Sequence, residues 1–328
     1  MLKTGKLDSE VLKRIIFDNI KFKRDEIITR PGIGEDCAEI DFGEYVCVMS
    51  TDPITASVSD IGRLSIHISC NDIASNGVQP LGIMLAVMLP VGTTEEDIET
   101  IMNQAAAAAE LMEVEIIGGH TEITPAVNKP VIVSTAIGRR SKNKVRQEIR
   151  EGDKIFITKF CGIEGTGIIA CDCADEVKSV LTLQELAEAE SMLDMVSVVK
   201  EGVTAGDIGV SAMHDITEGG VLGAVWELCQ VAGLGALIDT ADIPVRPVTK
   251  KICAHFGIDY LRLISSGCML IIAPPEKQQE LESRIDKIKC IGEIRSAEHG
   301  IMMVTDKGTE TIAPPESDEL YKAVNKGV

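Results

Sequence analysis

Apolar residues follow two different spacings along the chain, and each spacing predicts one type of element. Apolar positions three or four residues apart predict helices over residues 9–19, 63–75, 95–112, 183–199 and 219–231. Short, continuous apolar runs predict strands over residues 45–49, 81–89, 115–117, 131–137, 155–158 and 269–272. Because helices and strands alternate in both halves, the pattern favours an α/β or α+β fold.

A polar segment rich in Lys and Arg, Arg139 to Arg150, separates the two halves and is the best candidate for a linker. The length of 328 residues also suggests two domains. We therefore expect domains at residues 1–149 and 150–328. The Gly-rich stretch Gly162–Gly167 follows the first strand of the second half. It lacks the Gly-Lys-Ser/Thr of a Walker loop, so we interpret it as a turn from strand to helix.

The charge and composition narrow the range of partners. The net charge is −19, aromatic residues make up 3% of the chain, and no dense run of Lys and Arg is present, so nucleic acid is not expected as a partner. A polyanionic ligand such as ATP would need divalent cations between it and an acidic protein. The ten cysteines include no CxxC pair, and this pattern is typical of reduced, buried thiols.

The N-terminal residues and the length of the apolar stretches predict a cytoplasmic protein that does not contact membranes. The N-terminal residues Met1 to Glu10 are polar and lack the apolar core of a signal peptide. The longest apolar stretch, residues 81–90, has about half the length that a membrane span needs.

Four segments place small residues next to acidic ones, and a fifth places them next to a histidine. Carboxylate and hydroxyl oxygens are the ligands that magnesium prefers, and glycines let a backbone approach phosphate closely. Each segment also has a structural interpretation: Asp36 could shape a turn, Asp52 could end a strand, Asn71 and Asp72 could lie on a solvated helix face, and Thr217 could cap a helix. The five segments are residues 32–38, 50–53, 71–77, 214–220 and 118–122.

These segments and their order resemble a known superfamily. The motifs GIGEDCA, STDP, NDIASNGVQP, GGHTE, IGR, GIEGTGIIA, HDITEGGV and SSGCML run from about Pro31 to Leu270. They are similar to those of aminoimidazole ribonucleotide (AIR) synthetase (PurM), thiamine-monophosphate kinase, selenophosphate synthetase and the hydrogenase-maturation protein HypE. The resemblance implies a two-domain PurM-like fold with a C-terminal α/β lobe. It also implies a homodimer in which the N-terminal lobes form an intersubunit β-barrel, with ATP in a cleft near that interface.

The resemblance also assigns roles to individual residues. It implies that Asp72 and Asp215 take part in catalysis as well as in metal binding. The expected magnesium ligands are Asp36, Thr51, Asp52, Asp72 and Asp215. The residues expected next to ATP are Gly119, His120, Arg139, Thr217 and Glu218.

The chain departs from the named members at several positions. His120 stands where the kinase has an acidic metal ligand, and neutral imidazole is a poor ligand for magnesium. The stretch between Asp52 and Asp72 offers no match for the kinase's substrate histidine. The last residues, Asn325 to Val328, do not match the C-terminal cysteine tail of HypE, and the last cysteine, Cys290, stands in an apolar run that predicts a strand.

The leading functional hypothesis is an ATP- and magnesium-dependent enzyme. It would phosphorylate or activate an amide, carbonyl or phosphate acceptor, carried by a small molecule or by a protein. Hydrogenase-type maturation is one setting for such a reaction, although without the HypE tail chemistry. The alternatives are a thiamine-monophosphate kinase and a non-catalytic nucleotide-binding assembly protein.

Overall fold

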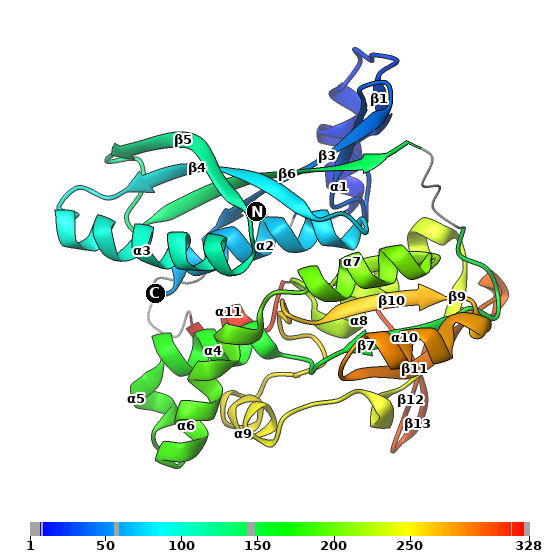
Figure 1. The fold of residues 1–328 in the computed structure, drawn as a ribbon. Coiled ribbons are helices and arrows are strands. Elements are labelled where there is room, and N and C mark those ends of the chain that lie inside the picture. The colour runs from blue at the N-terminus through cyan, green and yellow to red at the C-terminus, as the bar shows by residue number, and fades with distance from the viewer. Residues whose placement is uncertain (1–6, 8, 56–58, 143–147, 316, 325–328) are drawn as a thin grey trace.

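Two lobes, each built on one β-sheet, make up the computed structural model of the chain, which describes residues 7, 9–55, 59–142, 148–315 and 317–324 (Figure 1). The N-terminal sheet has the strand order β1-β2-β3-β6-β4-β5, and the C-terminal sheet the order β13-β12-β9-β11-β7-β10-β8. The strands of the N-terminal lobe are β1 (Ile27–Thr29), β2 (Ala38–Asp41), β3 (Tyr45–Ile54), β4 (Pro80–Leu89), β5 (Glu115–Ile123) and β6 (Val131–Ser141). Those of the C-terminal lobe are β7 (Lys154–Thr158), β8 (Ala212–Asp215), β9 (Gly235–Asp239), β10 (Met269–Ala273), β11 (Ile288–Arg295), β12 (Ile301–Thr305) and β13 (Gly308–Thr311).

Most of the helices belong to the C-terminal lobe. The N-terminal lobe has α1 (Ser9–Ile15), α2 (Ile61–Ser75) and α3 (Glu95–Leu111). The C-terminal lobe has α4 (Ile163–Asp172), α5 (Ala174–Val177), α6 (Leu183–Glu190), α7 (Val199–Ile208), α8 (Gly220–Ala232), α9 (Pro247–Phe256), α10 (Gln278–Arg284) and α11 (Leu320–Val324). No helix in the described part of the chain is long and apolar enough to cross a membrane.

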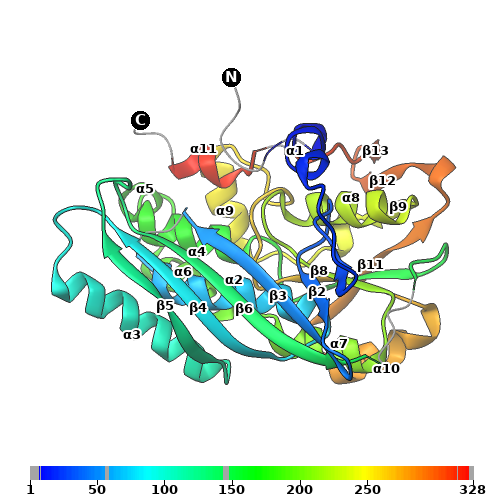
Figure 2. The same cartoon turned by 90° about the horizontal axis from the view of Figure 1, so that it is seen from above.

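The N-terminal sheet is covered by helices on one face only. Strands β3 and β6 pair antiparallel over their whole length, β4 joins β6 antiparallel, and β5 adds to β4 in parallel. Helices α2 and α3 lie against the face that is turned toward the C-terminal lobe (Figure 1). Figure 2 looks down on the opposite face, where no described helix crosses strands β4 to β6. We call this opposite face, with its side chains from β4 to β6, the open face.

Helix α2 lies between the two lobes and is almost completely buried. Every residue of this helix except Arg63 is buried, including polar ones such as Ser65 and Asn71. The helix packs against β3 and β6 on one side and against α7 and β8 of the other lobe. Asn71 joins the lobes directly: its Nδ2 donates to the carbonyl oxygen of Val196 at 2.8 Å, and its Oδ1 accepts from the amide of Val198 at 2.9 Å.

Glycines allow α7 to approach the end of α2 closely. A Cβ added to Gly202 would lie 2.4 Å from the carbonyl oxygen of Ala74, and one added to Gly206 would lie 2.5 Å from the Cα of Gly77. Such distances are closer than side chains tolerate. The backbones of the two helices therefore meet at a distance that only glycine permits.

The structure confirms the mixed α/β class and corrects several element boundaries. Strand β3 continues through residues 50–53, and β5 continues through residues 118–122, so both motifs lie inside strands. The stretch Gly162–Gly167 is not a separate turn: Gly162 precedes α4 and the other residues form its first turns. The single helix expected over residues 183–199 is interrupted by a 3-10 segment, Ser191–Met195, before α7 begins at Val199. Part of the expected linker belongs to β6, and residues 143–147 lie outside the described part.

The open face predicts self-association. It carries three large apolar side chains that are about half exposed, Leu81, Met84 and Ile117. We expect the protein to sediment as a dimer of about twice 35.2 kDa at micromolar concentration, because a second copy would bury these side chains and protect the edge strand β5. Met84→Lys should shift the protein to the monomer, since the new charge would have to be buried.

The control for this prediction is Leu183→Lys, which places a lysine at another exposed leucine, on α6 of the C-terminal lobe. It should leave the dimer unchanged. A wild-type protein that sediments at 35.2 kDa under these conditions would contradict the prediction.

Candidate active site between the lobes

The main cavity has a volume of about 590 Å³ and lies between the two lobes. Its N-terminal side comes from the segment before β2, from β3 and from α2. Its C-terminal side comes from α4, from the segments that precede α8 and β10, and from α11. Cavities of this size are typical of small-ligand sites.

Three aspartates from different elements, Asp36, Asp52 and Asp72, line this cavity, and a fourth, Asp215, lies next to them without lining it. Asp72 on α2 is buried, and its pKa is raised well above the ordinary value by burial and then by the charges of Asp215, Asp52 and Asp36. Like charges close to a buried carboxyl disfavour its ionised form, so each of the three neighbours adds to the effect of burial on Asp72. The Ser50 hydroxyl, on β3, donates a hydrogen bond to Oδ2 of Asp72. Three elements thus place negative charge around the Asp72 carboxylate of α2: the segment before β2, β3 and β8.

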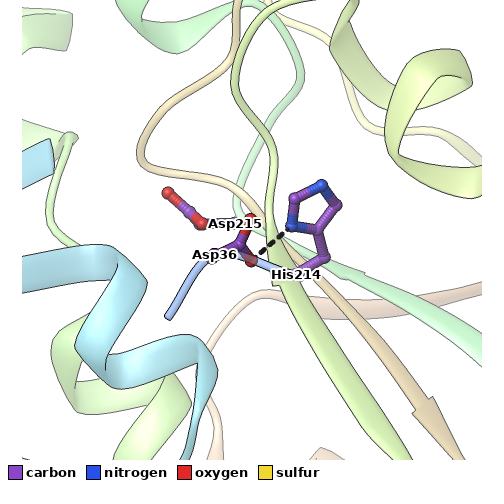
Figure 3. A group of neighbouring side chains, drawn as sticks. All are labelled: Asp36, His214 and Asp215. Carbon is purple, nitrogen blue, oxygen red and sulfur yellow. Dashed lines mark hydrogen bonds and ion pairs between the residues drawn. The ribbon is translucent and has the colours of Figure 1, made fainter. Parts of the chain in front are cut away.

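His214 contacts Asp36, one of these aspartates, and also Glu227. Its Nδ1 lies 2.8 Å from Oδ2 of Asp36 (Figure 3). Its Nε2 lies 2.9 Å from Oε2 of Glu227. Burial disfavours the charged ring, but the two carboxylates outweigh burial and raise the pKa of His214 well above its usual value. The ring is then an imidazolium that donates from both nitrogens, so it has no lone pair for a metal.

Asp36, His214 and Asp215 nevertheless form a compact group. One potential ligand atom from each lies within 4.8 Å of the others, and Figure 3 shows Asp36 between the other two side chains. Because both ring nitrogens of His214 already contact carboxylates, we expect the two aspartates to be the ligands and His214 to have a positioning role.

Thr51 also lines the cavity, but its hydroxyl is already bonded within the sheet. It donates to the carbonyl oxygen of Ser134 at 3.1 Å and lies 3.0 Å from the hydroxyl of Thr135. Asp52, one residue further along β3, is half-buried and has the Asp72 carboxylate as its neighbour. Of this adjacent pair, the aspartate is therefore the better placed metal ligand.

Thr217 and Glu218 lie on the C-terminal side of the cavity. Thr217 is not the cap of α8, because Gly219 occupies that position with a φ of 87°. The amide of Gly219 donates to Oδ2 of Asp318 at 2.7 Å, and Glu218 accepts a hydrogen bond from the Tyr321 hydroxyl at 3.1 Å. These contacts fix the segment before α8 against the C-terminal part of the chain.

Three residues expected next to the nucleotide do not line this cavity in the single chain. A Cβ at Gly119 would lie 1.9 Å from the carbonyl oxygen of Leu85, so the packing of the strand by itself explains why glycine stands at this position. His120 is exposed on the edge strand β5, where its Nε2 lies 3.3 Å from Oε2 of Glu122. The Arg139 guanidinium stacks over the ring of Tyr45 at 4.9 Å. Their nucleotide roles remain predictions.

The cavity also contains residues that sequence reasoning did not assign. Glu164 belongs to the Gly-rich stretch that was interpreted as a turn, Ser266 stands in the motif SSGCML, and Tyr321 follows the last recognised motif. The signal available for Glu164 was an acidic residue within an otherwise small and apolar segment. His214 stood next to Asp215 in the motif HDITEGGV, but its two carboxylate partners are distant in sequence.

The donor set of the base of the cavity fits a hard divalent cation. Asp36, Asp52, Asp72 and Asp215 offer only oxygen, which magnesium prefers. The repulsion that raises the pKa of Asp72 would be relieved by a cation among the carboxylates. This chain therefore has the residues to hold magnesium, and the cavity above them has room for a phosphate-bearing ligand.

Asp72→Asn should stabilise the protein when metal is removed with a chelator. The folded state raises the pKa of Asp72, so this group stabilises the fold at low pH, and the stabilisation is lost as pH rises through the raised pKa. The substitution keeps the shape of the side chain and removes its charge. We expect the variant to melt above the wild type at pH 8, by about 2–4 °C for each kcal/mol regained, and to approach the wild type at pH 4.

The control is Asp286→Asn, at an exposed aspartate in the C-terminal lobe. It should match the wild type at both pH values. Equal melting of Asp72→Asn and the wild type at pH 8 would show that Asp72 does not lie in a strained carboxylate group.

Comparisons with known proteins agree with this architecture. The family model of the N-terminal domain of AIR synthase related proteins matches residues 34–140, and that of the C-terminal domain matches residues 150–305. A candidate hydrogenase expression/formation protein of Methanocaldococcus jannaschii is 26% identical over 96% of both chains. The carbamoyl dehydratase HypE of Escherichia coli is 27% identical over 72% of both chains.

Solved structures share the fold at lower identity. A HypE–HypF complex contains a chain with a TM-score of 0.75 and 20% identity, and the match covers 93% of this chain and 99% of that one. HypE in complex with ATP has a TM-score of 0.72 and 20% identity, with 98% of both chains covered. AaThiL complexed with AMPPCP and TMP has a TM-score of 0.72 and 18% identity, with 94% of both covered. On the two domain models, which together span most of its length, the chain belongs to the AIR synthase related protein family.

Proposed function

We propose that this protein is an ATP- and magnesium-dependent enzyme that transfers the terminal phosphoryl group of ATP to an oxygen of an acceptor held in the cavity between the lobes. The observation that carries the proposal is the group of three aspartates around buried Asp72, next to a cavity of about 590 Å³ that Asp36, Asp52 and Asp72 line. A polyanionic nucleotide cannot approach four carboxylates unless cations lie between them.

The named relatives support the use of ATP. One structural neighbour is HypE bound to ATP, and another is ThiL bound to AMPPCP. Several sequence relatives carry the name carbamoyl dehydratase. These names favour an acceptor whose oxygen becomes a leaving group after phosphorylation.

The protein's own residues would bind, orient and stabilise charge in this reaction. Asp36, Asp52, Asp72 and Asp215 would hold magnesium, which when bound neutralises charge on the phosphates. His214 would keep Asp36 in place through the 2.8 Å contact. The cavity walls would align the acceptor oxygen with the phosphoryl group, and such positioning is the main contribution of proteins to this chemistry.

The identity of the acceptor separates the proposed enzyme from its alternatives. The AMPPCP- and TMP-bound ThiL structure keeps a thiamine-monophosphate kinase as the second candidate. The C-terminal side of the cavity carries Glu164 and Glu218 and, among its described lining residues, no Lys, Arg or His. An anionic acceptor is therefore disfavoured there, which argues for an acceptor that presents an uncharged or cationic group.

ATP and magnesium together should stabilise the protein more than either alone. A ligand that binds only the folded state adds about 2.7 kcal/mol at 100 times its dissociation constant. The melting temperature should therefore rise when ATP and magnesium are both present and change little with ATP alone. Asp52→Asn should lose most of this rise, because one magnesium ligand is removed, while the exposed control Asp286→Asn should keep it.

The melting curves also decide between a nucleotide protein and an unrelated one. Identical curves under all conditions would contradict the proposed function. If ATP and magnesium stabilise the protein but no tested acceptor leads to phosphate release, the non-catalytic alternative is favoured.

His214→Gln should weaken magnesium binding by about 10–100-fold, the usual effect of removing a group that orients a metal ligand. The substitution removes the imidazolium that bridges Asp36 and Glu227. Titration of magnesium in the presence of ATP, followed by melting temperature, measures the change. The control is His299→Gln, at an exposed histidine of the C-terminal lobe that is far from His214 along the chain. It should leave the magnesium affinity unchanged. An unaltered affinity in His214→Gln would show that His214 has no positioning role.

A further inference from the structure

Two buried polar atoms on the C-terminal side of the cavity make no hydrogen bond of ordinary geometry. Glu164, near the start of α4, is 5% exposed, and its Oε2 makes no hydrogen bond. Ser266, just before β10, is fully buried, and its Oγ makes no hydrogen bond of ordinary geometry, although it lies close enough to Glu164 to lower the pKa of that carboxyl in part. Both residues line the same cavity as Asp36, Asp52 and Asp72.

These groups are costly to the fold as it stands. A buried polar atom without a partner costs free energy, and a buried carboxylate without a cation costs more. The charged groups that face Glu164 are all acidic: Asp318 before α11, Glu218 before α8, and Asp215 at the end of β8. Burial first, and then these charges, raise the pKa of Glu164 to about 7 despite the Ser266 hydroxyl. Nothing in the described surroundings of Glu164 uses its second oxygen.

The cost has a functional explanation because both residues line the cavity, where a bound ligand would lie against them. The carboxylate oxygen of Glu164 accepts hydrogen bonds, and the Ser266 hydroxyl can donate or accept one. A ligand group with an N–H or O–H donor would satisfy Glu164. A carbonyl next to that donor, as in a primary carboxamide, would satisfy Ser266 as well.

We propose that Glu164 and Ser266 form the subsite that recognises the acceptor through an N–H or O–H donor on an uncharged or cationic group, and that this subsite rejects anionic groups. The inference rests on the proposed function for its statement that the ligand here is the acceptor. It goes beyond that function by naming the chemistry that the acceptor must present. Glu164 and Ser266 are specificity-determining residues, opposite the carboxylates that bind the cation.

The rejection of anions follows from the charges of the wall. Glu164 and Glu218 both line the cavity, and Asp318 lies behind them. A carboxylate or phosphate placed against Ser266 would meet these groups without a compensating lysine, arginine or histidine among the described residues of this wall. A neutral amide avoids that repulsion and keeps the hydrogen bonds.

The test measures binding of three small probes that share a propanoyl group and differ in charge and in N–H donors, without nucleotide or magnesium. The probes are propanamide, N,N-dimethylpropanamide and propanoate. Ligand-observed NMR at pH 8 measures the affinity of each probe for the wild type, Glu164→Gln and Ser266→Ala. We expect the wild type to bind propanamide and to bind the other two at least 10-fold more weakly. Glu164→Gln should weaken propanamide binding by about 10-fold or more, the scale of a hydrogen bond to a charged group, and Ser266→Ala by a smaller factor.

A pH series separates recognition from a merely structural role. Affinity of the wild type for propanamide should rise between pH 6 and pH 8 as Glu164 ionises, and Glu164→Gln should show a flat profile. Neither variant should melt below the wild type, because no protein hydrogen bond of ordinary geometry is lost at the unpartnered atoms. The matched control is Glu176→Gln, at an exposed glutamate on α5, which should behave like the wild type.

Several outcomes would overturn the inference. These are equal binding of all three probes, absence of propanamide binding to the wild type, unchanged affinity in both variants, and a flat pH profile for the wild type. The melting assay with ATP and magnesium is independent of this test. Glu164-dependent propanamide binding in a protein that ATP and magnesium do not stabilise would support the subsite and reject the proposed phosphoryl transfer.

Discussion

The structure depends on the burial of one helix between two lobes. Helix α2 is covered by the N-terminal sheet on one side and by α7 and β8 on the other, and Asn71 ties it to residues 196 and 198 of the second lobe. The close approach of Gly202 to Ala74 leaves little freedom for sliding. Because Asp72 follows Asn71 directly, the contact that joins the lobes also places the central carboxylate at the base of the cavity.

The cavity concentrates negative charge that the fold alone does not neutralise. Asp36, Asp52, Asp72 and Asp215 meet around one point, and the His214 imidazolium contacts Asp36 at the edge of this group. A fold selected for stability alone would replace such a group with apolar or paired residues. The unfavourable electrostatics therefore point to a cation that belongs to the working state, in the same way that the unpartnered oxygen of Glu164 points to a ligand on the opposite wall.

Sequence reasoning predicted the class of fold and the motifs that carry the aspartates, because local spacing and residue order encode both. It placed Asp72 on a helix correctly and left undecided whether this residue is exposed to solvent. The structure buries it. It ended strands too early at residues 49 and 117, since polar and glycine residues inside a strand interrupt the apolar pattern although the ladder continues. It also took Gly162–Gly167 for a turn, where Leu263 and Leu193 pack against the helix at Gly165 and Gly167.

The sequence by itself determined that the chain has a mixed α/β fold, an acidic character and an ordered set of Gly- and Asp-containing motifs that resemble one superfamily. Only the tertiary structure decided which of the candidate residues share a cavity: Asp36, Thr51, Asp52, Asp72, Thr217 and Glu218 line it, whereas Asp215, Gly119, His120 and Arg139 do not line it in the single chain. It also revealed His214 between two carboxylates and Glu164 beside Ser266. The physical reason is that distances between side chains 13 to 178 positions apart depend on how sheets and helices pack, and no local spacing encodes that packing.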